Sequence, residues 1–232
     1  MEKQKYTAIV LAAGSGKRMN SKVHKQYLII QDRPVLYYSL KAFEDSAVDE
    51  IVLVVGKGEE KFCRKEIVDK YGISKVKAIV EGGKERYHSV FEGLKQTSDA
   101  DYVLIHDGAR PFVNQDIIRR CMQEVQKYQA CVVGMPVKDT IKIADEEGYA
   151  KQTPDRKNVW MIQTPQTFSY ALIYEAYEEM LKPEDAAITD DAMVLERIKG
   201  KKSKLIEGSY RNIKITTPED LLIANVYLQH PE

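Results

Sequence analysis

The residues best suited to chemistry begin in a turn after the first apolar run of the chain, where residues 11–19 read LAAGSGKRM. Small side chains at positions 12–16 let the backbone turn sharply and approach a ligand, and the N–H groups of such a turn form a cradle for anions. Four cations follow within nine residues: Lys17, Arg18, Lys22 and Lys25. This much positive charge beside a glycine-rich turn predicts a site for a triphosphate.

Two other phosphate-binding patterns fail on spacing. The Walker loop requires GxxxxGK followed by Ser or Thr, whereas this turn reads GSGKR. The dinucleotide fingerprint requires a third glycine where this chain has Met19, and no clear acid stands at the ribose position about 20 residues further on. An NAD-dependent oxidoreductase therefore remains only as an alternative from another class of protein.

A second polar group, HDGAR at residues 106–110, directly follows the fourth apolar run. A carboxylate at the carboxyl end of a strand, above a phosphate-binding turn, is a natural ligand for Mg²⁺, which completes its octahedron with phosphate oxygens and water. Asp107 is therefore the predicted metal ligand. Arg110 offers a forked donor either to a phosphate or to a neighbouring carboxylate, and His106 is expected to be structural.

A third junction of this kind reads EGGKERYHS at residues 81–89. Gly82 and Gly83 permit close approach of a flat base or ribose, and Ser89 adds a hydroxyl group. On pattern alone, a binding role and a plain turn are equally well supported. A further set of polar residues lies next to apolar stretches without a distinctive pattern: Thr140, Arg156, Thr164, Asp190, Asp191 and Lys214.

Apolar runs and helical patterns alternate through the first part of the chain and must position these groups. The expected strands are 6–12, 51–55, 76–80, 102–105 and 130–135, and the expected helices are 34–43, 59–70, 85–95 and 115–127. Such alternation predicts an α/β, Rossmann-like domain whose mainly parallel central sheet is covered on both faces. Ligands in such sheets bind beyond the carboxyl ends of the strands, where all three polar groups are expected to lie.

The regular pattern breaks after Pro136. Residues 138–158 are charged and contain two short alternating pieces around the EEG sequence at 146–148, which is typical of a β-hairpin. This arm carries too few apolar residues to bury a core. We therefore expect residues 1–232 to form a single domain from which the arm protrudes, and we expect the arm to pack on a partner subunit. The expected later elements are helices over 171–181, 190–199 and 218–228 and strands over 204–207 and 212–215.

Composition excludes several other classes of protein. The 232 residues include 35 basic and 35 acidic side chains, so the chain has no overall attraction for nucleic acid or an anionic membrane. Its three cysteines are widely spaced and form no CxxC pair, which argues against a disulfide-rich fold or a zinc site. We see neither a signal peptide nor the roughly 20 apolar residues of a membrane helix, and expect a cytoplasmic protein.

Seven blocks of the sequence, in order, resemble the 2-C-methyl-D-erythritol 4-phosphate cytidylyltransferases of the non-mevalonate isoprenoid pathway. They are LAAGSGKRM…KQY, EGGKERYHSV, HDGARP, PVKDTIK, QTPQTF, TDDAMVLE and NIKITTPEDL. The resemblance covers nearly the whole chain and is highly specific. The chain departs from the family's usual pattern in having His24 where proline usually precedes the lysine, and Tyr87 where glutamine usually follows the arginine.

The resemblance implies a Rossmann-like nucleotidyltransferase whose arm exchanges across a homodimer. Arg18 and Lys25 would be the main catalytic cations, and Asp107 would lie near both the cytidine and Mg²⁺. The residues that would bind CTP are Ala12, Ala13, Gly14, Ser15, Gly82, Ser89, Asp107 and Lys214. The residues that would hold the sugar-alcohol phosphate are Arg110, Thr164 and, from the other subunit's arm, Thr140 and Arg156. Lys214 would serve either that phosphate or the phosphates nearby.

The implied reaction transfers the cytidylyl group of CTP to a phosphate and releases pyrophosphate. The attacking phosphate oxygen is already anionic at neutral pH, so the lack of an evident Ser-His-Asp or Cys-His set fits this reading. Ribitol-5-phosphate cytidylyltransferase of wall-polymer synthesis is the nearest alternative, but the LAAGSG turn and the TDDA block favour the methylerythritol enzyme. A nucleotide sensor without activity would not need Thr140 and Arg156.

Overall fold

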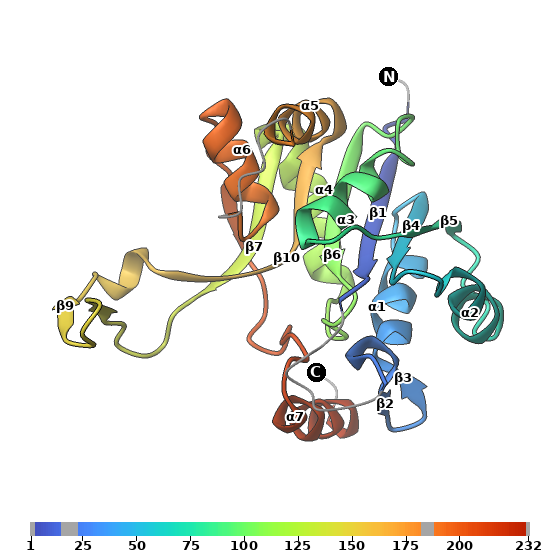
Figure 1. The fold of residues 1–232 in the computed structure, drawn as a ribbon, viewed down its shortest axis with the longest axis horizontal. Helices are drawn as coiled ribbons and strands as arrows, with labels where there is room; N and C mark the ends of the chain where they lie inside the picture. The colour runs from blue at the N-terminus through green and yellow to red at the C-terminus, as the bar shows by residue number, and fades with distance from the viewer. Residues whose placement is uncertain (1–2, 15–22, 182–187, 231–232) are drawn as a thin grey trace.

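The computed structural model describes residues 3–14, 23–181 and 188–230. Within them, seven strands form one sheet in the order β11-β7-β10-β6-β1-β4-β5 (Figure 1). In chain order these are β1 (Tyr6–Ala12), β4 (Glu50–Val55), β5 (Val76–Glu81), β6 (Tyr102–Asp107), β7 (Ala130–Pro136), β10 (Trp160–Ser169) and β11 (Lys204–Glu207). Strand β10 is antiparallel to its neighbours β6 and β7, and the other pairs are parallel. The prediction of an α/β fold with a mainly parallel sheet is confirmed.

Helices cover both faces of this sheet (Figure 1). On one face lie α1 (Val35–Glu44), α2 (Glu60–Cys63) with its π-helical continuation η3 (Arg64–Asp69), and α4 (Gln115–Tyr128); on the other lie α3 (Arg86–Leu94), α5 (Tyr170–Met180) and α6 (Asp191–Lys199). Because side chains alternate along a strand, Val10 joins the first core and its neighbour Ile9 joins the second. Burial on both faces explains why these strands read as continuous apolar runs.

Strand β10 lies in the middle of the sheet, although the sequence predicts no strand there. Residues 163–167 read QTPQT, which is not an apolar run. Gln163, Thr164 and Gln166 are tolerated inside because each finds a hydrogen-bond partner. Gln166 Oε1 accepts from the backbone N–H groups of Asp191 and Ala192, and Gln163 Nε2 donates to a backbone carbonyl in the loop after β11. The strand is therefore held in place by segments distant in sequence.

The predicted strand over 212–215 is wrong. This stretch runs past the turn after β6 instead of along a strand edge. Ile215 N donates to Ala109 O at 2.8 Å, and the fully buried side-chain amide of Asn212 donates to Thr164 O at 3.0 Å. Ile215 thus bonds the turn after β6 and the Asn212 side chain bonds β10, so the stretch joins no strand ladder and remains an irregular segment beside the carboxyl end of the sheet.

Helix α7 (Pro218–Gln229) closes this end of the molecule, with proline at the first helical position as predicted. Thr217 and Asp220 form a capping box at its start. The helix packs near a short hairpin of β2 (Ile29–Ile30) and β3 (Arg33–Pro34), and the two share a small apolar cluster of Ile30, Val35, Ile215 and Ala224. Each helix in the described residues is too short or too polar to cross a membrane.

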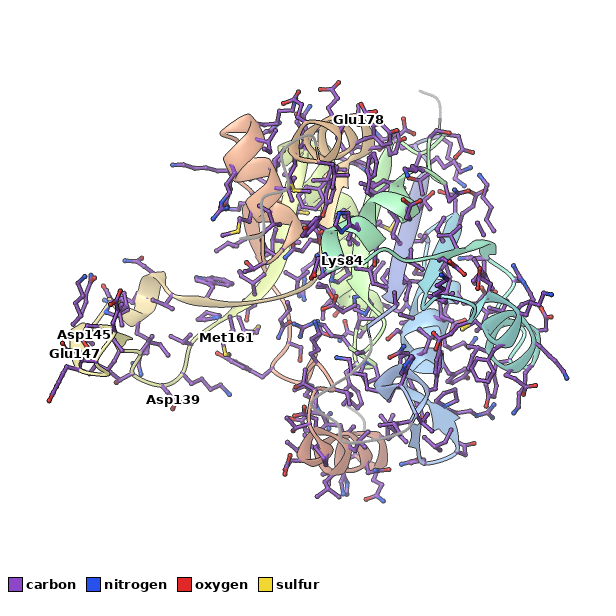
Figure 2. The ribbon with its side chains drawn as sticks, viewed as in Figure 1. Lys84, Asp139, Asp145, Glu147, Met161 and Glu178 are labelled. Atoms are coloured by element: carbon purple, nitrogen blue, oxygen red, sulfur yellow. The ribbon has the colours of Figure 1, made fainter. Side chains whose placement is uncertain are left out.

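Residues 138–158 extend away from the sheet as a thin arm (Figure 1). The arm holds the short strands β8 (Ile143–Ala144) and β9 (Ala150–Gln152) and the turn η4 (Arg156–Asn158). The residues of β8 and β9 are exposed, and so is the apolar ring of Tyr149, at 71%. Figure 2 places Asp145 and Glu147 at the tip of the arm, away from the body of the molecule.

Candidate active site

A cleft of about 380 Å³ opens at the carboxyl ends of β1 and β6. Strand β1 lies between β4 and β6, and the chain crosses from one side of it to the other between β5 and β6. The end of β1 is therefore a topological switch point, the usual place for a ligand in such a sheet. The cleft is lined by Leu11, Ala12, Ala13, Gly14, Lys25, Gln26, Gly83, Lys84, Glu85, Arg86, Ser89, Asp107, Ala109 and Lys214.

Asp107 lines the cleft from the end of β6, and its nearly buried carboxylate contacts three cations. Arg86 Nε lies 3.3 Å from Oδ1, while Lys214 Nζ and Arg110 Nε lie 2.7 Å and 3.9 Å from Oδ2. Burial alone would raise the pKa of Asp107, but the charges of Arg86, Lys214 and Arg110 outweigh it and hold that pKa far below its usual range. The carboxylate is therefore ionised at neutral pH.

The turn after β6 is supported by His106, whose ring is fully buried. Burial lowers the pKa of His106 to about 4, so the ring is neutral at neutral pH. Its Nε2 lies 3.2 Å from Arg110 O and its Nδ1 lies 3.0 Å from Thr164 Oγ1, so we assign the single ring proton to Nε2. Thr164 Oγ1 accepts from the backbone N–H of Asp107 at 3.1 Å. This agrees with the structural role expected for His106.

Asp191 belongs to the same site, although no pattern in the sequence assigns it a distinct role. Its carboxylate is fully buried, accepts two 2.8 Å hydrogen bonds from the guanidinium of Arg86, and accepts a third at 2.6 Å from the hydroxyl of Tyr177. Arg86 thus bridges Asp191 and Asp107, and these charges raise its pKa although burial opposes them. Asp190 caps the start of α6, so the cap does not account for the second acid, Asp191. That unexplained neighbour is the sequence signal that could have pointed to Asp191.

Lys25 lines the cleft from the turn η2 (Lys25–Tyr27). Its Nζ donates to Ile215 O at 3.0 Å, in the irregular segment that also carries Lys214. The next residue, Gln26, is buried, and its side-chain amide donates to Ala12 O at the end of β1. Lys25 and Lys214 therefore bring two ammonium groups to the same cleft.

The glycine junctions allow two backbone segments to approach closely. A Cβ built on Gly82 would lie 2.5 Å from Ala13 Cβ and 2.6 Å from Ser89 Oγ, so glycine is needed there. Ser89 Oγ also accepts from the backbone N–H of Gly83 at 3.1 Å. Of the predicted residues in the turn after β1, Ala12, Ala13 and Gly14 line the cleft, whereas Ser15 and Arg18 lie outside the described residues.

The predicted sugar-phosphate residues are not brought together within this one chain. Arg110 is largely buried, and its Nη1 donates to Asn212 O at 2.8 Å. The hydroxyl of Thr164 is engaged by His106, as described above. Thr140 and Arg156 are exposed on the arm, where Arg156 Nη1 donates to the backbone carbonyl of Lys138 at 2.9 Å. In Figure 2 the arm lies well away from the labelled Lys84 at the cleft.

A divalent cation would find one main protein ligand here. The described residues contain no group of three or more His, Cys, Asp or Glu side chains able to hold a metal by themselves. Asp107 does present an ionised carboxylate to the cleft, with Lys214 at its Oδ2. The carboxylate is a ligand of the kind that Mg²⁺ uses, since this ion keeps several waters and binds through one or two carboxylates plus phosphate oxygens. Arg86 and Lys214 contact its two oxygens, so one of these contacts would have to give way to the ion.

Comparisons with known proteins agree on one family. A family model described as 2-C-methyl-D-erythritol 4-phosphate cytidylyltransferase (IspD) matches residues 6–230. The enzyme of that name from Lachnoclostridium phytofermentans is 51% identical over 97% of each chain, and the one from Lachnospira eligens is 54% identical over 96% of this chain and 99% of its own. The crystal structure of 4-diphosphocytidyl-2C-methyl-D-erythritol synthase from Anaerococcus prevotii superposes with a TM-score of 0.86 at 38% identity, covering 98% of this chain and 97% of that one.

Proposed function

Since the chain belongs to the 2-C-methyl-D-erythritol 4-phosphate cytidylyltransferase family, we propose that the cleft beside Asp107 is where it transfers the cytidylyl group of CTP to that substrate. The reaction forms a bond between a phosphate oxygen of the substrate and the α-phosphorus of CTP. It breaks the bond from that phosphorus to the bridging oxygen, which leaves with pyrophosphate. The main support for placing the reaction in this cleft is that Lys25, Lys214 and Asp107 all line it at the switch point of the sheet.

The chemistry requires positioning and charge stabilisation more than proton transfer. The attacking phosphate is anionic at neutral pH, so no general base is needed. Two anions must be held in line, and negative charge builds up on the phosphoryl oxygens and the departing pyrophosphate. Lys25 and Lys214 supply positive charge within the cleft, and Arg18, which follows the glycine-rich turn, is proposed as a further catalytic cation.

We assign CTP to the side of the cleft formed by the two glycine junctions. Backbone N–H groups of Ala12, Ala13 and Gly14, continuing to Ser15, bind the triphosphate, with Lys214 beside it. The cytidine is proposed to lie against the junction that Gly82 begins, where the next residue, Gly83, and Ser89 line the cleft. Asp107 would hold Mg²⁺, which when bound neutralises phosphate charge during the transfer.

We further propose that the sugar-phosphate side is completed by the arm of a second copy in a homodimer. The arm carries Thr140 and Arg156 but extends away from its own cleft (Figure 1). Its apolar side chains Ile143 and Tyr149 are exposed and lack a core of their own, which supports packing on a partner. Arg110 and Thr164 both contact Asp107 from within the chain, and we propose that they complete this side of the site.

Replacing Arg156 with alanine is expected to raise the KM for the sugar-alcohol phosphate by more than it raises the KM for CTP. The reason is that the guanidinium is proposed to bind the substrate phosphate from the partner's arm and not the nucleotide. Steady-state kinetics with each substrate varied in turn measures both constants. Lys157→Ala, at the next position of the same turn, is the matched control. Equal increases in the two KM values would contradict the proposal that Arg156 binds the sugar-alcohol phosphate.

The proposed function is tested by pyrophosphate release from CTP and Mg²⁺ with 2-C-methyl-D-erythritol 4-phosphate and, separately, with ribitol 5-phosphate. We expect release with the methylerythritol compound and none above background with ribitol 5-phosphate. Release with ribitol 5-phosphate alone would mean that the enzyme carries out the same chemistry on the substrate of wall-polymer synthesis. Release with neither acceptor would contradict the assigned reaction.

A further inference from the structure

One carboxylate, that of Glu59, contacts the chain on both sides of Lys25. Glu59 Oε1 lies 2.7 Å from Nδ1 of His24, the residue before Lys25, and the two form an ion pair when the imidazole is protonated. Glu59 Oε2 accepts a 2.7 Å hydrogen bond from the hydroxyl of Tyr27, two residues after Lys25. Lys25 itself points its ammonium group to Ile215 O beside the cleft. The two flanking side chains therefore meet at Glu59 while the lysine between them serves the site.

Glu59 is itself fixed to the sheet. It stands in the turn between β4 and α2, where its Oε2 also accepts from the backbone N–H of Gly56 at 3.0 Å. A Cβ on Gly56 would lie 2.6 Å from that oxygen, so the glycine makes room for the carboxylate. The same turn is joined to β5, because Gly58 N donates to Glu81 Oε1 at 2.8 Å. The carboxylate thus has a defined position before it meets the Lys25 segment.

Tyr27 is held in its place by more than its hydroxyl hydrogen bond. Its ring packs edge-on against Phe62 with centroids 5.1 Å apart, and its hydroxyl lies 3.0 Å from Cys63 Sγ. Burial, helped by Cys63 and Glu59, raises the pKa of Tyr27 well above its usual value, so the phenol stays a neutral donor to the carboxylate.

The Lys25 turn is also attached to the neighbouring strand. Gln26 donates its side-chain amide to Ala12 O at the end of β1, and in the sheet Ala12 lies opposite Val55 of β4. Gln26 therefore ties the turn to β1, and Glu59 ties it to the turn after β4. Attachment to two adjacent strands restricts the backbone on each side of Lys25.

We propose that Glu59 is a positioning residue for the transfer reaction, because its carboxylate fixes both flanks of Lys25 and thereby sets where the ammonium group stands in the cleft. This inference rests on the catalytic role proposed above for Lys25. A lysine has a flexible four-carbon stem, so its backbone must be well placed for the ammonium group to meet charge that develops in the transition state. Displacement of such a group by about 1 Å lowers rates by up to about 10²-fold.

The first test is the Glu59→Ala variant, assayed by pyrophosphate release. We expect kcat to fall between about 10-fold and about 10²-fold, while the KM for CTP stays within about threefold, since the lost interaction matters mainly in the transition state. Glu60→Ala, the next acid on α2, is the matched control, because among the described residues Glu60 makes none of these contacts with the Lys25 segment. Unchanged kcat in a folded Glu59→Ala variant would overturn the proposal.

A double-mutant cycle separates positioning of Lys25 from a general structural effect. If Glu59 acts through Lys25, adding Glu59→Ala to the Lys25→Ala variant should lower kcat by less than about threefold more. If Glu59→Ala lowers kcat as much in the Lys25→Ala variant as it does in the wild type, the proposal is overturned, even if the Glu59→Ala variant by itself has a low kcat. If Lys25→Ala alone leaves kcat unchanged, the catalytic assignment of Lys25 fails first, and the inference about Glu59 fails with it.

A milder variant keeps the test decisive if Glu59→Ala does not fold. The double variant His24→Ala/Tyr27→Phe removes both partner groups but leaves Glu59 and its bond to Gly56, and it keeps the aromatic ring that packs on Phe62. We expect the same pattern, a loss of kcat of at least about 10-fold with little change in the KM for CTP. Wild-type turnover in this variant would show that the two contacts do not position Lys25.

Discussion

The Lys25→Ala variant is expected to lose about 10²–10³-fold in kcat, roughly 3–4 kcal/mol of transition-state stabilisation, while remaining folded. Its ammonium group reaches the cleft from η2 and donates to Ile215 O, next to Lys214 of the Asp107 cluster. A preorganised donor of this kind acts on the charge that develops at the α-phosphorus and on the leaving pyrophosphate. Initial rates of pyrophosphate release at saturating substrates measure the effect.

Two further measurements make that result interpretable. The thermal unfolding transition of Lys25→Ala should match that of the wild type, because the ammonium group is only part-buried and its hydrogen bond goes to a backbone carbonyl of an irregular segment. Lys65→Ala, an exposed lysine on η3, is the control and should keep wild-type turnover. A kcat for Lys25→Ala within a few-fold of the wild-type value would contradict the catalytic role proposed for Lys25.

The second large effect is expected on stability, from Asp191→Asn. The change preserves the size of the side chain but leaves the paired guanidinium of Arg86 without its fully buried counter-charge. Removing one charge of a buried pair typically costs about 3–5 kcal/mol, because the other charge remains desolvated. We expect the lower end of that range, because Arg86 keeps its contact with Asp107 and is partly exposed. We expect the midpoint of urea unfolding, followed by circular dichroism, to fall accordingly, with the slope of the transition unchanged.

Glu196→Gln is the matched control for this stability measurement. Glu196 lies on the same helix α6 but is exposed, and surface changes of this type usually alter the free energy of unfolding by less than about 0.5 kcal/mol. If Asp191→Asn shifts the urea midpoint no more than Glu196→Gln does, the Arg86–Asp191 pair does not contribute as the geometry indicates.

The strand–turn–helix units at the start of the chain could be predicted because they are local. The run from Tyr6 to Ala12, the glycines after it and the cations that follow lie within one short stretch, and the period of the apolar residues identifies the strand. The same holds for Asp107 at the end of β6 and for Gly82 at the end of β5. Parallel strands bring such ends to one edge of the sheet, so the cleft residues of one chain follow from the pattern.

Strand β10 and the segment 212–215 were misread because their structure depends on partners elsewhere. Gln166 is buried in β10 only because its side chain bonds the start of α6. Residues 212–215 look like a strand by alternation, but Ile215 bonds the turn after β6 and the buried side chain of Asn212 bonds Thr164 of β10. Polar groups inside a protein are stable when they are satisfied, and their partners cannot be read from the neighbouring sequence.

The order of residues along the chain sets which side chains stand at the strand ends. From these the sequence predicts the class of chemistry: a triphosphate turn, a carboxylate for a cation, and no need for a nucleophilic side chain. The tertiary structure alone decided how these groups are held. It joins Arg86 to Asp191 across 105 positions and Glu59 to both flanks of Lys25. Backbone periodicity is a local property, whereas pairing of buried charges depends on which distant segments the fold brings together.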